Sequence, residues 1–209
     1  GRRRLTEFYG EGLSDRMVRS CHTTCRTALE KAVTEGLITT NPAIGCRLPP
    51  KKAKEMQVLT QDEIRRFLIQ ANEEGYYEFF LLELTTGMRR GEILGLQWKD
   101  VNFATGELHI RRQVVKKGAQ TQITKPKTKS SIRTLILPPD MMDILAEHKK
   151  TATCEWVFPS PVKKGEPRNP DSIYGKFQKI LKRAQCKKVR FHDLRHTFAT
   201  MALENGMRS

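Results

Sequence analysis

The feature that most constrains the fold is a change of apolar periodicity near the middle of this 209-residue chain. Before residue 98 and again after residue 138, apolar residues recur every three or four positions, which is the helical period. Between residues 106 and 137, polar and apolar residues alternate in short runs, as in half-buried strands. We therefore expect a mainly helical α+β fold with one small antiparallel β-sheet in its middle.

Local signals predict where the elements begin and end. Ser14 is the expected N-cap of a first helix that ends before Gly36, and Thr60 with Glu63 forms an expected capping box. On the first helix, Met17, Cys21 and Cys25 share an apolar stripe and are expected to pack in a core. The other expected helices cover residues 76–86, a short stretch ending near 98, 139–150, a segment beginning at 169, and 192–205. The expected strands cover residues 106–111, 120–124 and 132–137.

A domain boundary is expected at Pro49–Lys54, which has the composition of a stiff, basic linker. It separates a first part, residues 1–52, from a second part, residues 53–209. The first part has one long helix, too little to bury a core of its own. We therefore expect it to be the end of a larger domain.

Charge points to a polyanionic partner. The net charge is +15, and it is distributed in blocks: residues 111–133 carry eight basic and no acidic residues, whereas residues 55–107 are acidic. Basic blocks of this kind predict separate contacts with nucleic acid phosphates, although a charge that only aids solubility is an alternative.

Several classes of protein are disfavoured by composition. No apolar run is long enough to span a bilayer and no signal peptide is visible, so we expect a cytoplasmic protein without membrane contacts. Five scattered cysteines do not form a disulfide framework, and Cys21 and Cys25 lack a second ligand pair for zinc. We expect no metal and no small-molecule cofactor.

Two short motifs could bind and cleave a phosphodiester. In the first, Arg89 stands at a helix start with Glu92 three residues later, which suits bidentate phosphate binding or a plain surface ion pair. In the second, His192 and Arg195 share a helical face, where a histidine can move protons beside an arginine that holds oxygen. A structural role for His192 as a cap is the alternative, and His196 is expected to point elsewhere.

Two further features suggest DNA contacts. A lysine-rich turn at residues 124–131 could reach into a groove or donate a proton to a leaving oxygen. The polar face of the first helix could enter a major groove, or simply be solvated. The residues expected to contact DNA are Arg16, Arg19, Ser20, Thr23, Arg26, Lys51, Lys52, Lys54, Arg90, Lys125, Lys129 and Arg133.

These motifs, in this order, closely resemble the tyrosine recombinases, or phage integrases. The resemblance rests on the run Leu84–Trp98, the lysine hairpin and the run Phe191–Thr200. The segment Ala28–Ala43 is similar to the end of the core-binding domain of this family. The chain is most similar in character to integrases of Gram-positive conjugative transposons.

The resemblance implies a reaction and its residues. Arg89 and Arg195 would bind the scissile phosphate, with Glu92 in a supporting position. Lys127, with Lys129 as second choice, would protonate the leaving 5′-oxygen, and His192 would assist acid–base chemistry. The implied activity is site-specific recombination that integrates and excises a mobile element in bacteria, through a 3′-phosphotyrosyl intermediate. The implied partners are double-stranded DNA and further copies of the protein, as a tetramer on two sites.

The sequence departs from the family pattern in its tyrosines. Tyr9, Tyr76, Tyr77 and Tyr174 all precede the second motif, whereas the family nucleophile follows it. We therefore expect a fragment that lacks the C-terminal helices, binds DNA and does not cleave it. A non-catalytic DNA-binding regulator, a type IB topoisomerase and an RNA-binding protein are the alternatives.

Overall fold

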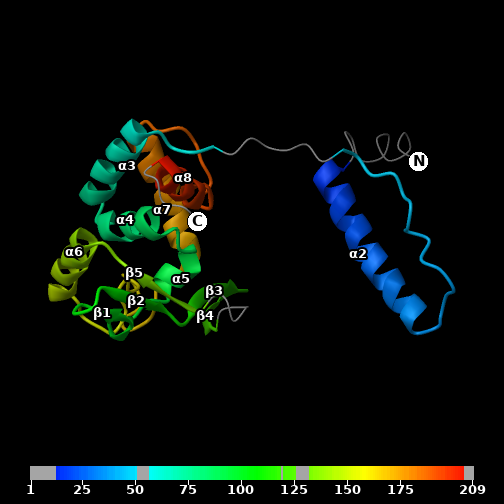
Figure 1. Cartoon of the computed structure of the whole chain (residues 1–209), viewed down its shortest axis with the longest axis horizontal. Helices are drawn as coiled ribbons and strands as arrows, with labels where there is room; N and C mark the ends of the chain where they lie inside the picture. The colour runs from blue at the N-terminus through cyan, green and yellow to red at the C-terminus, as the bar shows by residue number, and fades with distance from the viewer. Residues whose placement is uncertain (1–12, 51–56, 119, 126–131, 205–209) are drawn as a thin grey trace. The chain divides into compact units, whose positions relative to one another are not determined.

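The computed structural model describes residues 13–50, 57–118, 120–125 and 132–204, with side chains as far as residue 198. The chain divides into two compact units, residues 1–55 and 56–209 (Figure 1). The roles expected for the two parts of the chain stay predictions.

The first unit is built on one helix, α2 (Asp15–Thr34). Ser14 caps it as expected, with its hydroxyl accepting a hydrogen bond from the Met17 N–H at 3.3 Å. The following segment folds back on the helix mainly through polar contacts, in which the Asn41 side chain donates to the Arg26 carbonyl and to Glu30. Gly36 adopts the left-handed conformation (φ 73°) that lets the chain turn at the helix end.

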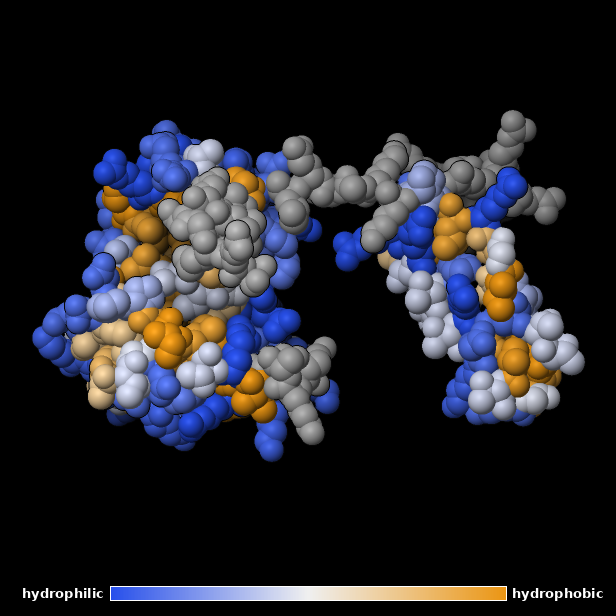
Figure 2. All heavy atoms as spheres, in the orientation of Figure 1, coloured by the Kyte–Doolittle hydropathy of each residue, from blue (hydrophilic) through white to orange (hydrophobic). Residues whose placement is uncertain are grey.

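The expected core packing of this helix is wrong. No residue of α2 is buried, and Cys21, Cys25 and Met17 are exposed. The reason is that the described part of the unit offers no second helix or sheet against which the stripe could pack. Figure 2 shows apolar and polar side chains interleaved on the surface of this unit. Its large exposed apolar residues are Leu13, Met17, Leu37 and Ile44.

The second unit contains most of the helices. The capping box of Thr60 and Glu63 begins the first of them, as predicted. In chain order the helices are α3 (Gln61–Glu73), α4 (Tyr77–Thr86), α5 (Arg90–Leu94), the 3-10 helix η1 (Trp98–Asp100), α6 (Pro139–Lys150), α7 (Pro170–Arg183) and α8 (Asp193–Glu204). Among the described residues, no helix of either unit has the length and hydrophobicity needed to cross a membrane.

The strands confirm an α+β fold with small antiparallel strand pairing but form two sheets where one was expected. They are β1 (Val101–Asn102), β2 (Glu107–Ile110), β3 (Gln113–Lys117), β4 (Gln120–Thr124) and β5 (Arg133–Ile136). One sheet has the order β1-β2-β5, with Leu108 opposite Leu135, and β3 pairs with β4 in a separate hairpin. The sequence predicted one sheet and missed β1 and β3, because β1 is two residues long and β3 follows β2 after only two residues.

The core of this unit lies where α3, α4, α7 and α8 gather, above the strands in Figure 1. Its centre is a group of aromatic rings in edge or tilted contact, with Phe67 and Phe80 at 4.9 Å between centroids. Phe177 from α7 and Phe191 from the turn before α8 complete the group. Burial of such rings fixes the ends of α4 and α8 next to each other.

A close approach of α5 to β3 also positions the site. A Cβ placed on Gly91 would lie 2.6 Å from the Val114 carbonyl oxygen, so only glycine fits there without movement of the backbone. Gly87, between α4 and α5, has φ 58° and turns the chain sharply before Arg89. These two glycines set the direction in which the first motif faces.

Candidate functional site: a cationic cavity between the two motifs

The first motif is held by a buried carboxylate. Glu92 is 1% exposed and accepts hydrogen bonds from the Arg89 backbone N–H and from its Nη1, each at 3.0 Å. Arg133 from β5 donates to the same carboxylate at 3.0 Å. Burial alone would raise the pKa of Glu92, but the hydrogen bonds from Arg133 and Arg89 outweigh it and lower the pKa. The carboxylate therefore stays ionised and fixes both arginines.

The second motif begins with a similar clamp. Asp193, which is 2% exposed, accepts hydrogen bonds from the Arg190 backbone N–H and from its Nη2, each at 2.8 Å. This closes the turn that starts α8 and leaves His192 exposed and Arg195 half-buried. His196 does not point elsewhere as expected, because its ring lies 5.2 Å from the ring of His192. A separation of four residues brings both rings to one side of the helix.

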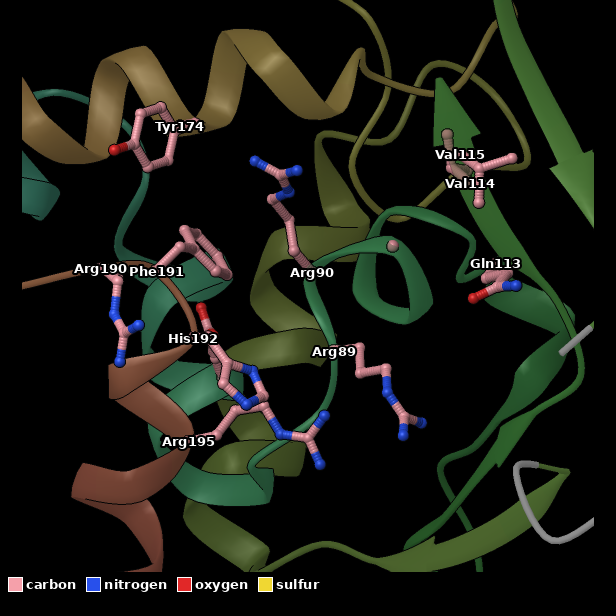
Figure 3. A pocket seen from close by; sticks show the side chains of 12 residues that line it. Arg89, Arg90, Gln113, Val114, Val115, Tyr174, Arg190, Phe191, His192 and Arg195 are labelled. Carbon is pink, nitrogen blue, oxygen red and sulfur yellow. The ribbon is translucent and has the colours of Figure 1, made fainter. Parts of the chain in front are cut away.

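The two motifs line one cavity of about 510 Å³. In Figure 3 the guanidinium groups of Arg89 and Arg195 and the imidazole of His192 lie on the same side of it. The lining residues are Glu83, Arg89, Arg90, Gly91, Gln113, Val114, Val115, Tyr174, Arg190, Phe191, His192 and Arg195. Residues about a hundred positions apart in the sequence therefore meet in one place.

The electrostatics of this cavity favour an anion. Burial lowers the pKa of Arg195, and the nearby positive charge of Arg89 lowers it further. No hydrogen bond or ion pair joins the Arg195 guanidinium to another described side chain. Two neighbouring guanidinium groups repel each other unless an anion lies between them, and a tetrahedral phosphate has the oxygens that both can bind.

His192 is suited to move a proton. Burial lowers its pKa, and the positive charge of Arg195 and the neighbouring His196 lower it further. The imidazole is therefore neutral near pH 7, with one ring nitrogen able to accept a proton. Its place beside Arg195 puts this nitrogen next to any oxyanion held by the two arginines.

Other predicted site residues lie elsewhere or outside the described residues. Lys51, Lys52, Lys54, Lys127 and Lys129 fall outside them, and Lys125 is exposed just after β4. Arg133 is bound to Glu92, which the sequence did not indicate. On α2, the Arg19 guanidinium donates to the Pro49 carbonyl, so it is not free on the polar face as expected. The face also holds Arg16, Ser20, Thr23 and Arg26, all exposed.

Among the cavity residues that the sequence did not place at the site are Glu83, Tyr174 and Arg190. Glu83 is fully buried in α4, and its signal was an acidic residue inside the apolar run Phe79–Leu84. Tyr174 and Arg190 line the cavity from α7 and from the turn before α8. Nothing in the sequence around Tyr174 or Arg190 distinguishes either one from a surface residue.

Known proteins resemble the chain in sequence and structure. A "Tyrosine recombinase XerC-like" protein of Caldanaerobacter subterraneus subsp. tengcongensis is 29% identical over 98% of this chain and 60% of its own length. The Tn1549 transposon integrase bound to transposon right end DNA has a TM-score of 0.82 at 21% identity, over 98% of this chain and 71% of its own. A lambda integrase tetramer bound to a Holliday junction has a TM-score of 0.64 at 20% identity, over 88% and 53%.

The chain spans about half to three-fifths of the length of the curated relatives that it matches. The likeness to the solved structures, at 20–21% identity, shows a shared fold and no more. The model of the phage integrase family matches residues 57–209, which is most of the chain and includes both motifs. The chain therefore belongs to the phage integrase family.

Proposed function

We propose that this chain binds duplex DNA and holds one of its phosphates for cleavage and rejoining, in a site-specific recombinase that integrates and excises a mobile element. The observation that carries the proposal is the meeting of Arg89, Arg195 and His192 in one cavity. Membership of the phage integrase family supports it. So does the net charge of +15, because each neutralised phosphate releases counterions.

The geometry supports definite roles in this reaction. Arg89 and Arg195 hold two non-bridging oxygens of the phosphate and stabilise the charge that develops when a nucleophile attacks phosphorus. Glu92 positions Arg89 through its hydrogen bonds with the backbone N–H and the guanidinium of that arginine. His192, neutral at rest, accepts a proton as the nucleophile loses one. We propose that Lys127, or else Lys129, donates a proton to the 5′-oxygen that leaves. The proton that the lysine gives up balances the proton that His192 accepts, and these steps need no metal.

The proposed nucleophile is a tyrosine, which becomes linked to the 3′-phosphate. Two of the described tyrosines, Tyr76 and Tyr174, are poorly suited to that role. Tyr76 lies under the cations of Arg168 and Lys176, at 4.9 and 5.3 Å from its ring centroid. The hydroxyl of Tyr174 points away from the tips of Arg89 and Arg195 (Figure 3). We also propose that the working assembly is a tetramer on two DNA sites, which the lambda integrase tetramer bound to a Holliday junction supports.

The test compares this chain with the longest protein that its gene encodes, on a nicked duplex that traps a covalent protein–DNA adduct. We expect both proteins to bind duplex DNA, and the longer one to form an adduct if it brings a tyrosine to the cavity. Arg195→Ala should abolish the adduct while most DNA binding survives, because the arginine stabilises the transition state.

The outcomes separate the proposal from its rivals. Duplex binding without any adduct, in the protein with the added tyrosine, would indicate a DNA-binding regulator. Relaxation of supercoiled DNA without site preference would indicate a topoisomerase. Stronger competition by RNA than by duplex DNA would contradict the proposal altogether.

A further inference from the structure

The cavity has a second half that the proposed chemistry does not use. In Figure 3 the side chain of Arg90 points toward α7 and Tyr174, away from the tips of Arg89 and Arg195. Its guanidinium carbon lies over the ring of Phe191, 5.5 Å from the ring centroid, in a cation–π contact. Within the described part of the chain, no hydrogen bond or ion pair is made by this half-buried guanidinium.

A second polar group in the same cavity is also unsatisfied. Glu83 is fully buried, and neither oxygen of its carboxyl group has a hydrogen-bond partner among the described residues. A buried polar group without a hydrogen-bond partner destabilises the fold, so such groups are rare unless a ligand or water supplies the missing bond. Glu83 and Arg90 lie close enough to influence each other electrostatically, yet no hydrogen bond joins them.

The protonation states make this half of the cavity a donor site. Burial raises the pKa of Glu83 well above its usual range, although the charges of Arg195 and Arg90 act in the opposite direction. Burial therefore favours the protonated carboxyl group, which presents an O–H donor. Burial lowers the pKa of Arg90, with Asp171, Glu83 and Tyr174 opposing the change, and an arginine remains charged at pH 7.

The nearby acidic group does not neutralise Arg90. Asp171, at the start of α7, forms an ion pair with Lys116 at 2.5 Å between Nζ and Oδ2. Among the described residues that line the cavity, Glu83 is therefore the only acidic one beside the Arg90 guanidinium. The cavity volume of about 510 Å³ also exceeds what a single phosphate group would fill.

We propose that Arg90 and Glu83 form a second phosphate subsite, which takes a backbone phosphate adjacent to the one held by Arg89 and Arg195. The inference rests on the proposed function, because it assigns the second anion to the same DNA strand. Two contiguous phosphates would fix the direction of the strand through the cavity. A single clamped phosphate leaves that direction open.

The test measures binding of this chain to a fluorescent 30-base-pair duplex of mixed sequence at several KCl concentrations. Loss of one phosphate contact should reduce the slope of log K against log salt by about 0.9, which is roughly an eightfold loss of affinity at 0.1 M salt. We expect this for Arg90→Gln. The matched control is Arg65→Gln, which removes the same charge from an exposed site on α3 outside the cavity and should leave the slope unchanged.

The Glu83 variants test the role of the donor. Glu83→Met removes the O–H donor and should weaken duplex binding several-fold. Glu83→Gln, which retains an N–H donor of similar shape, should lose less. If the carboxyl group only fills space in the core, the two variants will bind DNA equally.

A measurement on the unaltered chain covers the case in which Arg90→Gln fails to fold. An arginine-specific dicarbonyl reagent is applied with and without saturating duplex DNA, and the modified peptides are identified by mass spectrometry. DNA should protect Arg90 several-fold and leave Arg65 unaffected. Equal modification of Arg90 in both samples, or a slope for Arg90→Gln equal to that of Arg65→Gln, overturns the subsite. Failure of the unaltered chain to bind duplex DNA at all refutes the proposed function instead.

Discussion

Glu92→Ala removes the carboxylate that holds the first motif, and its cost can be worked from the contacts. The variant leaves Arg89 and Arg133 without their shared acceptor and deprives one backbone N–H of its partner. Removing one partner of a buried ion pair lowers the free energy of unfolding by about 3–5 kcal/mol. The Arg89 side chain is 55% exposed, so water replaces part of its interaction and the lower end of that range applies.

A loss of about 3 kcal/mol lowers the melting temperature of a unit of this size by roughly 6–12 °C. Urea unfolding followed by tryptophan fluorescence is the assay, because Trp98 and Trp156, the two tryptophans of the sequence, both lie in the second unit. The control is Glu147→Ala, which removes an exposed carboxylate paired with Lys150 and should leave the urea midpoint unchanged. A loss below about 1 kcal/mol for Glu92→Ala would refute the reasoning, because removing a buried carboxylate bonded to two arginines and a backbone N–H should destabilise the fold by more than that.

Three further predictions concern pH and packing. Burial acts to raise the pKa of Glu63, but hydrogen bonds from two backbone N–H groups hold the pKa at about 2. The ionised carboxylate therefore stabilises the fold by about 3 kcal/mol above pH 4.5, and this stabilisation is lost as the pH falls toward 2. In urea unfolding, the free energy of unfolding of Glu63→Gln should be far below that of the parent at pH 6 and close to it at pH 2. NMR titration of His192 should give a midpoint below 6.5 that rises in Arg195→Gln, because one of the charges that lowers the pKa is removed; an unchanged midpoint would contradict this. Gly91→Ala should lower the free energy of unfolding in urea by about 1–3 kcal/mol, because the added Cβ clashes with the β3 backbone. The control Gly175→Ala has open space around its Cβ and should stabilise α7 slightly. Equal effects of the two substitutions would contradict the assigned packing.

The parts of the fold that depend on local chemistry were predictable. The Ser14 cap, the Thr60 capping box and the turn at Gly87 each depend on residues within a few positions of one another, so the sequence shows them directly. Arg89 and Arg195, which line one cavity, were candidates from the sequence because each stands in a recognisable motif. The family was identified from the order of these motifs.

The parts that depend on distant contacts were not predictable. The pairing of β2 with β5 passes over the β3–β4 hairpin, and no local signal marks this exchange of neighbours. Arg133 meets Glu92 across 41 positions, so its residue type suggested DNA and not a buried carboxylate. The apolar stripe of α2 led to the wrong prediction of a packed core. Periodicity shows that one face of a helix is apolar, but it does not show whether another element covers that face.

The most direct test of the account is the structure of this chain bound to duplex DNA. We predict one backbone phosphate with non-bridging oxygens about 2.7–2.9 Å from guanidinium nitrogens of both Arg89 and Arg195, with the His192 ring beside it. DNA that contacts other surfaces, with no phosphate between these two arginines, would contradict the account.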